Sequence, residues 1–258
     1  MNSIDAKHLY TRDYFLRQVD GHHEFAAFRG EEVQLFERHR RNLQLLEMAP
    51  HHRFLDVGCG RGELVLCHAA RGGNATGIDF SDDAIALARH KARELGVGCE
   101  FIVGSFTALS MTRRYDRILA SEFIEHVSAD EGAQFFRMAR TLLTPGGRLI
   151  VYTYPNVLQR SFGYPLSRWL VRLATGEKLP RVQPDAVDEH HRLFHLNEQS
   201  YYSLRATARK AGFSRVRTFY DASQPPPRTR WGKWFRTVAH RGPLRHLFLT
   251  HLVCCAEA

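Results

Sequence analysis

Short apolar runs alternate with amphipathic segments between residues 51 and 155 of this chain. The apolar runs predict five strands, at 53–58, 74–80, 99–105, 115–121 and 148–155. The amphipathic segments between them predict three helices, at 62–72, 81–96 and 128–147. Ser81 and Gly96 suit the start and the end of the second of these helices. Strands that alternate with helices predict an α/β fold with a doubly wound, mostly parallel sheet.

The first fifty residues show a helical pattern instead, and they predict an N-terminal helical cap at 1–50. Over 31–48, acidic residues come first and arginines later, which suits the dipole of a helix that ends before Pro50. The helical spacing selects four positions of this segment for burial: Val33, Phe36, Leu43 and Leu46.

After residue 155 the alternation stops. Three further elements are predicted: a helix at 197–213 and strands at 214–221 and 247–258. Two inserts interrupt them, at about 157–195 and at about 222–245, and the first begins with a basic amphipathic stretch. No crossover helix separates the last two strands, so they are expected to pair antiparallel. The prediction is a Rossmann-like, seven-stranded sheet with an antiparallel last strand, in one domain at 51–258.

Composition narrows the class of protein. The 258 residues include 36 Lys and Arg against 27 Asp and Glu, a net charge of +9 that can attract nucleic acid, anionic lipid or an acidic substrate. No run of 18 apolar residues predicts a membrane span, and the N-terminus lacks a signal-peptide pattern, so a cytoplasmic protein is expected. The five cysteines show no zinc or CxxC spacing and are predicted to be buried free thiols: Cys59, Cys67, Cys99, Cys254 and Cys255.

A glycine-rich loop, "FLDVGCGRGEL", joins the first strand to the next helix. Glycines let the chain turn sharply and let a ligand approach the backbone, and the N-terminus of the following helix favours an anion. A dinucleotide-binding loop follows G-x-G-x-x-G, which would place its third glycine where Glu63 stands. The observed pattern is D-x-G-x-G-x-G, from Asp56 to Gly62, and Asp79 ends the next strand.

This pattern resembles motif I of class I S-adenosylmethionine-dependent methyltransferases, and "GIDFS" resembles their second motif. The resemblance implies that Gly58, Gly60 and Gly62, with Cys59 between them, line the methionine part of S-adenosylmethionine. It also implies that Asp56 helps to hold the amino group of the cofactor.

At the other end of the cofactor, the resemblance implies that Asp79 accepts both ribose hydroxyls and that Phe80 packs on the adenine. It extends the cofactor site to Ser105, Phe106 and Glu122. Ser105 stands where many relatives have an acidic residue, so the adenine contact stays open.

The segment "ASEFIEHV" follows the fourth strand, on the side where this fold holds the methyl acceptor. At helical spacing Glu122, Glu125 and His126 share one face. Three interpretations compete: a solvated turn that His126 caps, a general base at His126 oriented by a carboxylate, or a divalent-cation site that lowers the pKa of the acceptor hydroxyl.

A metal site needs a further ligand, and His190, His191 and His195 lie in "DEHHRLFHLNEQ". E-x-x-E-H followed by a distal histidine resembles the small-RNA 3′-terminal 2′-O-methyltransferases, and quinone-biosynthesis O-methyltransferases share the E-x-x-E-H turn. The first resemblance implies a metal held by Glu122, Glu125, His126 and His191. Mixed Glu and His ligands fit Mg²⁺, Mn²⁺, Fe²⁺, Co²⁺ or Zn²⁺.

The acceptor is the least defined part of the prediction. Seven aromatic residues are candidate walls of its pocket: Tyr10, Tyr14, Phe15, Tyr154, Phe162, Tyr164 and Trp169. The basic aromatic segment 228–241 suits either peripheral contact with an anionic membrane or RNA, and RNA is the weaker alternative because no RNA-binding module accompanies it.

The expected function is therefore methyl transfer to a hydroxyl of a small molecule, a sugar or a lipid-linked acceptor, assisted by a divalent metal. Alternatives are RNA ribose 2′-O-methylation, a metal-free reaction with His126 as the base on oxygen, nitrogen or carbon, and a binding protein without turnover.

Overall fold

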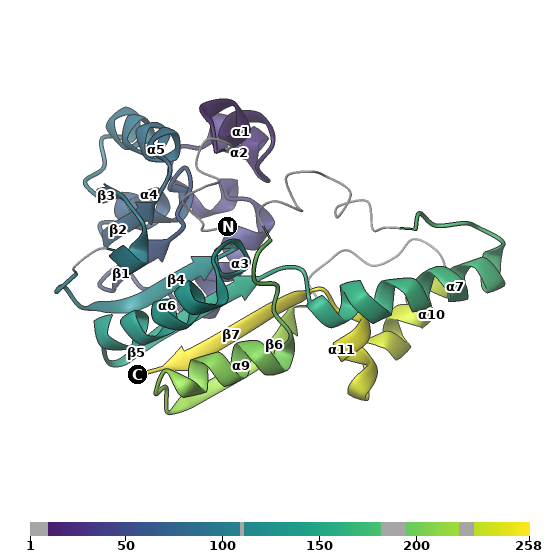
Figure 1. The fold of residues 1–258 in the computed structure, drawn as a ribbon. Helices are drawn as coiled ribbons and strands as arrows, with labels where there is room; N and C mark the ends of the chain where they lie inside the picture. The colour runs from purple at the N-terminus through teal and green to yellow at the C-terminus, as the bar shows by residue number, and fades with distance from the viewer. Residues whose placement is uncertain (1–9, 109–110, 182–194, 222–229) are drawn as a thin grey trace.

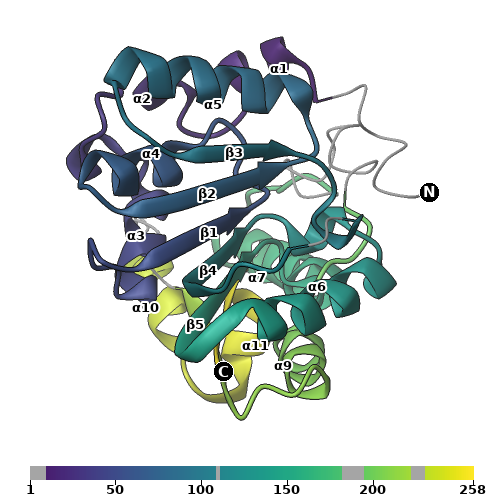
Figure 2. The same cartoon turned by 90° about the vertical axis from the view of Figure 1, so that its left-hand side faces the viewer.

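The computed structural model describes residues 10–108, 111–181, 195–221 and 230–258. Seven strands form one sheet, in the order β3-β2-β1-β4-β5-β7-β6 (Figures 1 and 2). Their bounds are β1 Arg53–Val57, β2 Asn74–Asp79, β3 Glu100–Val103, β4 Tyr115–Ser121, β5 Leu143–Thr153, β6 Arg215–Asp221 and β7 His251–Glu257. β7 lies between β5 and β6 and is antiparallel to both. The predicted fold, with its antiparallel last strand, is confirmed.

Helices cover both faces of the sheet (Figure 2). One hydrophobic core joins the sheet to α3 Glu37–Leu46, α4 Glu63–Ala70 and α5 Asp82–Leu95, and the other joins it to α6 Ala129–Leu142 and α9 Tyr201–Lys210. Neighbouring residues of β4 belong to opposite cores, because side chains alternate along a strand: Leu119 packs in the first core, and Ile118 and Ala120 pack in the second. Burial on both faces explains the continuous apolar runs of the sequence.

The N-terminal region forms short helices: α1 Arg12–Arg17, α2 His22–Ala27 and η2 Glu32–Gln34, followed by α3. The single helix predicted over 31–48 is wrong, because Leu35 and Phe36 have extended backbones between η2 and α3. This break rotates the apolar face. Val33, predicted to be buried, is 72% exposed, whereas Leu35 is buried.

Two boundaries later in the chain also differ from the prediction. The helix predicted over 128–147 ends at Leu142, and β5 begins at the next residue. A proline disfavours helical backbone in the residue before it, and Pro145 follows Thr144. The strand predicted from residue 247 begins at His251, because α11 Arg245–Phe248 occupies the preceding residues.

A group of helices projects beyond the end of the sheet (Figure 1). It contains η5 Gln159–Gly163, α7 Tyr164–Thr175, α10 Arg230–Ala239, η7 Gly242–Leu244 and α11, and we refer to it as the helical arm. The Asn156 side chain donates to the carbonyls of His246 and Leu249, at 2.7 and 2.9 Å, which ties the residues after β5 to α11. Gly163 packs so tightly that a Cβ there would lie 1.6 Å from the Leu247 carbonyl oxygen. Within the described ranges, no helix of the arm or the core has the length and apolar character needed to cross a bilayer.

Candidate cofactor and acceptor site

A cavity opens where β1, β2 and β4 end. Strand order reverses between β1 and β4, and ligands of open α/β sheets bind at such switch points. Most of the lining comes from four sources: the loop at 56–63, the ends of β2 and β3 with Asp79, Phe80, Ser105 and Phe106, the N-terminal region with Tyr10, Tyr14, Phe15, Asp20 and Arg38, and the turn after β4 with Glu122, Phe123 and His126.

The glycine loop forms the floor of the cavity. The N–H groups of Gly58 and Cys59 donate to the Ile78 carbonyl at 2.8 and 3.0 Å, which fixes the loop against β2. Gly62 precedes α4 with φ +78°, and a Cβ there would lie 2.5 Å from the Phe101 ring. Neither the backbone angle nor the space admits a side chain, so this glycine is required by both conformation and packing.

Asp79 ends β2 with its carboxylate held by backbone donors. The N–H groups of Gly60 and Ser81 each donate to it at 2.9 Å. Burial raises the pKa of Asp79, while these N–H groups oppose the rise. A carboxylate accepts about four hydrogen bonds, so Asp79 retains capacity for a pair of ligand hydroxyls. Phe80 lies beside it, with its ring 4.8 Å from the Tyr10 ring.

Asp56 lies at the other end of the floor, only 4% exposed. Burial, together with the nearby carboxylates of Glu63 and Asp79, raises its pKa to about 8. A buried carboxylate among like charges is stabilised by a cation in the cavity. The site therefore suits a ligand with a positive charge near the glycine loop.

Arg61 fastens the N-terminal region to this loop. Its side chain is 2% exposed, and it donates to the carbonyls of Phe15 at 2.6 Å and of Asp20 at 3.1 Å. It also forms an ion pair with Glu63 at 2.6 Å, so its charge is compensated. Because of these bonds, the N-terminal region forms part of the cavity wall.

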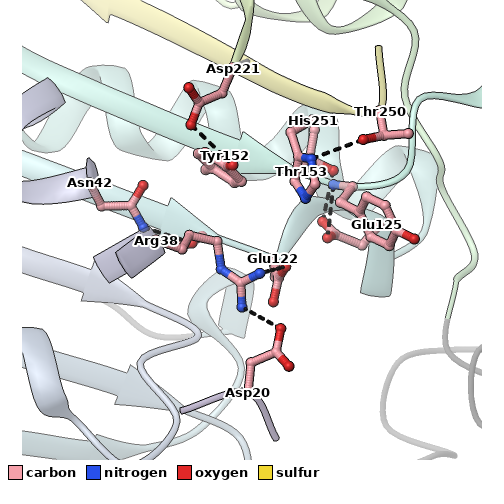
Figure 3. Close-up of polar contacts among 12 residues, drawn as sticks. Asp20, Arg38, Asn42, Glu122, Glu125, Tyr152, Thr153, Asp221, Thr250 and His251 are labelled. Atoms are coloured by element: carbon pink, nitrogen blue, oxygen red, sulfur yellow. Dashed lines mark hydrogen bonds and ion pairs between the residues drawn. The ribbon is translucent and has the colours of Figure 1, made fainter. Parts of the chain in front are cut away.

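Arg38 reaches the cavity from the first turn of α3 (Figure 3). Its guanidinium contacts Glu122 at 2.6 Å and Asp20 at 3.3 Å, and its side chain is 13% exposed. Burial raises the pKa of Glu122, and the Arg38 charge opposes the rise. These contacts join three segments that are distant in the sequence: the N-terminal region, α3 and the turn after β4.

The turn after β4 gives its two glutamates different partners. Glu122 has φ +52°, a left-handed backbone, before the 3₁₀ turn η4 Ile124–His126. Glu125 is 1% exposed and accepts from the Thr153 hydroxyl at 2.8 Å and from the Tyr154 N–H at 3.3 Å (Figure 3). The prediction that both glutamates share a helical face with His126 is therefore wrong, because the left-handed residue interrupts the helical spacing.

His126 lines the cavity and is half-buried. The Tyr10 hydroxyl is 3.4 Å from its Nδ1 atom. The ring of His195 makes an edge-to-face contact with it, at 4.9 Å between centroids. Of the three distal histidines, His195 is thus the one that the structure places beside His126, while His190 and His191 lie outside the described residues.

The predicted metal ligands are only partly described. Among the described residues, no three His, Cys, Asp or Glu side chains are placed to hold a metal ion. The carboxylate of Glu122 is engaged by Arg38, and that of Glu125 by Thr153. Both glutamates are therefore occupied with protein partners. The described residues do not fit the predicted set of four ligands, and His191, the fourth, is outside the described ranges.

The remaining predicted residues divide into two groups. Ser105 and Phe106 line the cavity beside Asp79, and the Ser105 hydroxyl lies 3.0 Å from that of Thr107. Tyr10, Tyr14 and Phe15 line it as expected. The same pocket was also predicted to have walls at Tyr154, Phe162, Tyr164 and Trp169. None of these four residues lines the cavity, and Phe162 and Trp169 are 62% and 60% exposed on the helical arm. That part of the prediction is wrong.

A family model described as "Methyltransferase domain" matches residues 54–147, from β1 into β5. The match contains the glycine loop, Asp79 and the turn after β4. This chain therefore contains a methyltransferase domain over residues 54–147.

Relatives of the methyltransferase domain are found among ubiquinone biosynthesis O-methyltransferases. That of Colwellia psychrerythraea is 31% identical over 140 residues, which are 54% of this chain and 53% of the relative. That of Pseudomonas aeruginosa is 35% identical over 103 residues, 39% of this chain and 44% of the relative. The chain spans about half the length of the curated relatives it matches.

Solved structures share the fold. An S-adenosylmethionine-dependent methyltransferase from Methanosarcina mazei aligns with a TM-score of 0.55 at 21% identity, over 86% of this chain and 97% of its own. Magnesium protoporphyrin IX methyltransferase from Synechocystis PCC 6803, solved with bound SAH, aligns with a TM-score of 0.54 at 18% identity, over 95% of this chain and 97% of its own.

Arg38, Asp20 and Arg61 were not among the site residues predicted from the sequence. Arg38 is one of three arginines between residues 38 and 41, and helical spacing alone does not show which of them is buried. Arg61 lies inside the glycine loop, where a charged residue between two glycines is a usable signal. The sequence gives no such signal for Asp20, because its part in the site depends on a contact with Arg38, 18 residues away.

Proposed function

We propose that this protein is an O-methyltransferase that uses His126 as the general base for an acceptor hydroxyl. The observation that carries the proposal is that His126, in the turn after β4, lines the same cavity as the glycine loop. An imidazole titrates near neutrality and suits removal of a proton as the methyl group is transferred. S-adenosylmethionine supplies the methyl group as an electrophilic sulfonium.

The chain's own residues fit this cofactor at three points. Asp79 has acceptor capacity for the ribose hydroxyls, and the Asp56 carboxyl group, which loses its proton when a cation binds, matches the ammonium group. Arg38 also lines the cavity. A guanidinium carries five donors, so Arg38 can bind the carboxylate of the cofactor in addition to its two protein partners. The remaining predicted contacts, with Gly58, Cys59, Gly60, Gly62, Phe80, Ser105, Phe106 and Glu122, belong to the same proposal, and all of them line the cavity except Gly62.

The position of His126 is set by its neighbours rather than by its own turn. Tyr10 lies against Nδ1, and the proposal assigns the transferred proton to Nε2. Glu125 is buried beneath the turn, and its backbone carbonyl accepts from the N–H groups of Leu196 and Asn197 at 2.8 and 3.1 Å. In this arrangement Glu125 acts as a positioning residue for the turn, and Glu122 orients Arg38. Catalysis otherwise comes from holding the two reactants in line.

Replacing His126 by glutamine tests the proposal. Transfer of radiolabelled methyl groups to a panel of phenols, catechols, sugars and lipid-linked hydroxyls identifies an acceptor first. We expect H126Q to lower kcat by about 10²–10⁴-fold, the usual contribution of a general base. The affinity for S-adenosylmethionine, measured by calorimetry, is expected to stay within about threefold of wild type. An equivalent loss in kcat and in affinity would instead indicate a damaged fold.

The control for this variant is His195→Gln, which removes the ring beside His126 without removing the proposed base. Retention of wild-type turnover by H126Q would overturn the assignment. Calorimetric binding of the cofactor without transfer to any acceptor in the panel would favour a binding protein over an enzyme.

The metal-assisted reaction stays a prediction. It requires Glu122 to exchange Arg38 for an ion, and it requires His191. Metal analysis of the purified protein, with activity measured after treatment with a chelator and after return of Mg²⁺, Mn²⁺, Fe²⁺, Co²⁺ or Zn²⁺, separates the two mechanisms. Full activity in the metal-free protein supports His126 acting without an ion. Loss of activity that an ion restores supports the metal.

A further inference from the structure

The helical arm exposes a continuous apolar stripe. Phe162, Leu166, Trp169 and Leu173 are spaced by four, three and four residues, which places them on one face of η5 and α7. This face is not buried against the protein: the four residues are 62%, 40%, 60% and 66% exposed. Helix faces of this kind normally pack inward, so an exposed one marks an interaction surface.

Helix α10 also exposes large apolar side chains. Trp234 and Val238, one turn apart, are 61% and 36% exposed. The two segments belong to one structural unit, because η5 packs on α11 through Gly163, and Phe235 of α10 contacts Phe248 of α11 at 5.1 Å between ring centroids. Figure 1 shows α7, α10 and α11 together beyond the end of the sheet.

The charge of these segments is strongly one-sided. Residues 157–176 contain three arginines and no acidic residue, and residues 230–250 contain five basic residues and no acidic one. The net charge of the whole chain is +9, so most of its excess lies in these two segments. On α7, Arg168 and Arg172 each come directly before a residue of the stripe. On α10, Arg230 and Lys233 precede Trp234 by four residues and by one.

We infer that the arm is a docking surface for an anionic lipid bilayer. Large apolar side chains that insert at the boundary of the headgroups, beside basic side chains that pair with anionic headgroups, are the combination that holds an interfacial helix. Tryptophan is favoured at this depth because its ring is apolar and its N–H is polar. A second copy of the chain fits less well, because two arms without acidic residues would repel each other.

The position of the arm also bears on the proposed methyl transfer. This one point rests on the proposed function. The segment that leads to α7 follows the carboxyl end of β5, and His126 follows the carboxyl end of the neighbouring parallel strand β4. The arm and the cavity therefore lie at the same edge of the sheet. A bilayer on the arm would present an acceptor hydroxyl carried by a lipid to that edge.

Vesicle binding tests the surface without any acceptor or cofactor. All three tryptophans of the chain lie in these segments, at 169, 231 and 234, so intrinsic fluorescence reports on the arm directly. With vesicles of phosphatidylcholine and phosphatidylglycerol we expect co-flotation and a blue shift of the emission. With pure phosphatidylcholine, or at high salt, we expect binding to fall by about tenfold or more.

Two pairs of variants make the test specific. Leu173→Glu is expected to lower binding to the anionic vesicles by about tenfold or more, whereas Val33→Glu, at a 72% exposed apolar residue of η2, is expected to leave it unchanged. Arg168→Gln with Arg172→Gln is expected to weaken binding, and the matched pair Arg209→Gln with Lys210→Gln on α9 is not. Circular dichroism confirms that each variant is folded.

Three outcomes would overturn the inference. The first is no flotation with anionic vesicles at low salt. The second is equal binding by Leu173→Glu and wild type. The third is a protein that does not bind vesicles but instead binds single-stranded RNA, or forms a dimer that the Leu173→Glu substitution disrupts. Because none of these measurements uses methyl transfer, failure of the membrane surface and failure of the proposed enzyme activity are distinguishable.

Discussion

The Tyr10 hydroxyl lies 3.4 Å from Nδ1 of His126, although 116 residues separate the two in the sequence. The same tyrosine accepts a hydrogen bond at its carbonyl from the Ser81 hydroxyl, at 2.9 Å, and packs its ring edge-to-face on Phe80. Tyr10 therefore spans the cavity from the end of β2 to the turn after β4. Its position links the cofactor side of the site to the proposed base.

We expect Tyr10→Phe to lower kcat by about 2- to 10-fold, the cost of one neutral hydrogen bond in the transition state. The ring contacts with Phe80 persist in the variant, so the affinity for S-adenosylmethionine is expected to change little. If Tyr10 accepts from the Nδ1–H group, its loss makes the imidazole less basic, and the acidic limb of the pH–rate profile moves to lower pH. An unchanged profile with full kcat would contradict this role. Tyr202→Phe serves as the control.

Removal of Arg38 is expected to weaken the cofactor site and the fold together. Arg38→Met leaves the carboxylates of Glu122 and Asp20 without this partner, at a cost of about 1–3 kcal/mol in the free energy of unfolding. We expect the affinity for S-adenosylmethionine to fall by about tenfold or more, because a charged hydrogen bond to the ligand is lost with it. Urea denaturation and calorimetry measure the two effects.

A double-mutant cycle with Glu122→Gln separates the ion pair from the effect on the ligand. If the pair alone matters, the double variant is more stable than the sum of the single losses predicts, because no charge is left unpaired. If Arg38 binds the ligand itself, the affinity for the cofactor stays low in the double variant. Wild-type affinity in Arg38→Met would rule out contact with the cofactor.

Asp56 is expected to make the stability of the cofactor-free protein depend on pH. Its folded-state pKa of about 8 lies above the ordinary value for an aspartate, so the folded protein binds the proton more tightly than the unfolded chain. This contribution is fully present below the unfolded pKa and is lost as the pH rises through about 8, with a slope of up to about 1.4 kcal/mol per pH unit.

Asp56→Asn removes this dependence. We therefore expect the stability difference between wild type and variant, from urea denaturation between pH 4 and pH 9, to shift in favour of the variant as the pH rises. Binding of S-adenosylmethionine near pH 7 is expected to release a proton from the wild type and less from the variant, as measured by calorimetry in buffers of different ionisation enthalpy. Equal proton release in both proteins would contradict a titrating Asp56.

Gly62→Ala is expected to destabilise the protein more than Gly96→Ala. Both glycines have a left-handed backbone, at φ +78° and +66°, and an alanine there costs about 1–2 kcal/mol. Only at Gly62 would the new Cβ also meet the Phe101 ring, whereas at Gly96 no heavy atom lies within 4 Å. The difference between the two variants in urea denaturation isolates the packing cost. Equal losses would show that Phe101 moves aside freely.

The cofactor half of the site could be predicted from the sequence because its residues are set locally. A strand, a glycine turn and a helix follow one another within residues 53–70, and their spacing alone brings the loop to the end of β1. Asp79 is placed by the next strand in the same way. The predicted helix boundaries were wrong at two places. There the backbone is extended, at Leu35 and before Pro145, although the apolar spacing continues the helical pattern.

The acceptor half could not be predicted at the same level. Helical spacing grouped Glu122 with Glu125, but a single left-handed residue directs one carboxylate toward Arg38 and leaves the other buried at Thr153. Conformations of this kind depend on the partners that compensate them, and those partners come from distant segments.

By itself, the sequence determined the order of strands and helices, the glycine loop and the acid at the end of β2, because each depends on residues within one βα unit. Only the tertiary structure decided that Tyr10 and His195 meet at His126 and that Arg38 joins Asp20 to Glu122. The tertiary structure also left the apolar face of α7 exposed. The reason is physical: helical periodicity states which residues share a face, but only the packing of distant segments decides whether that face, or a charge on it, is covered.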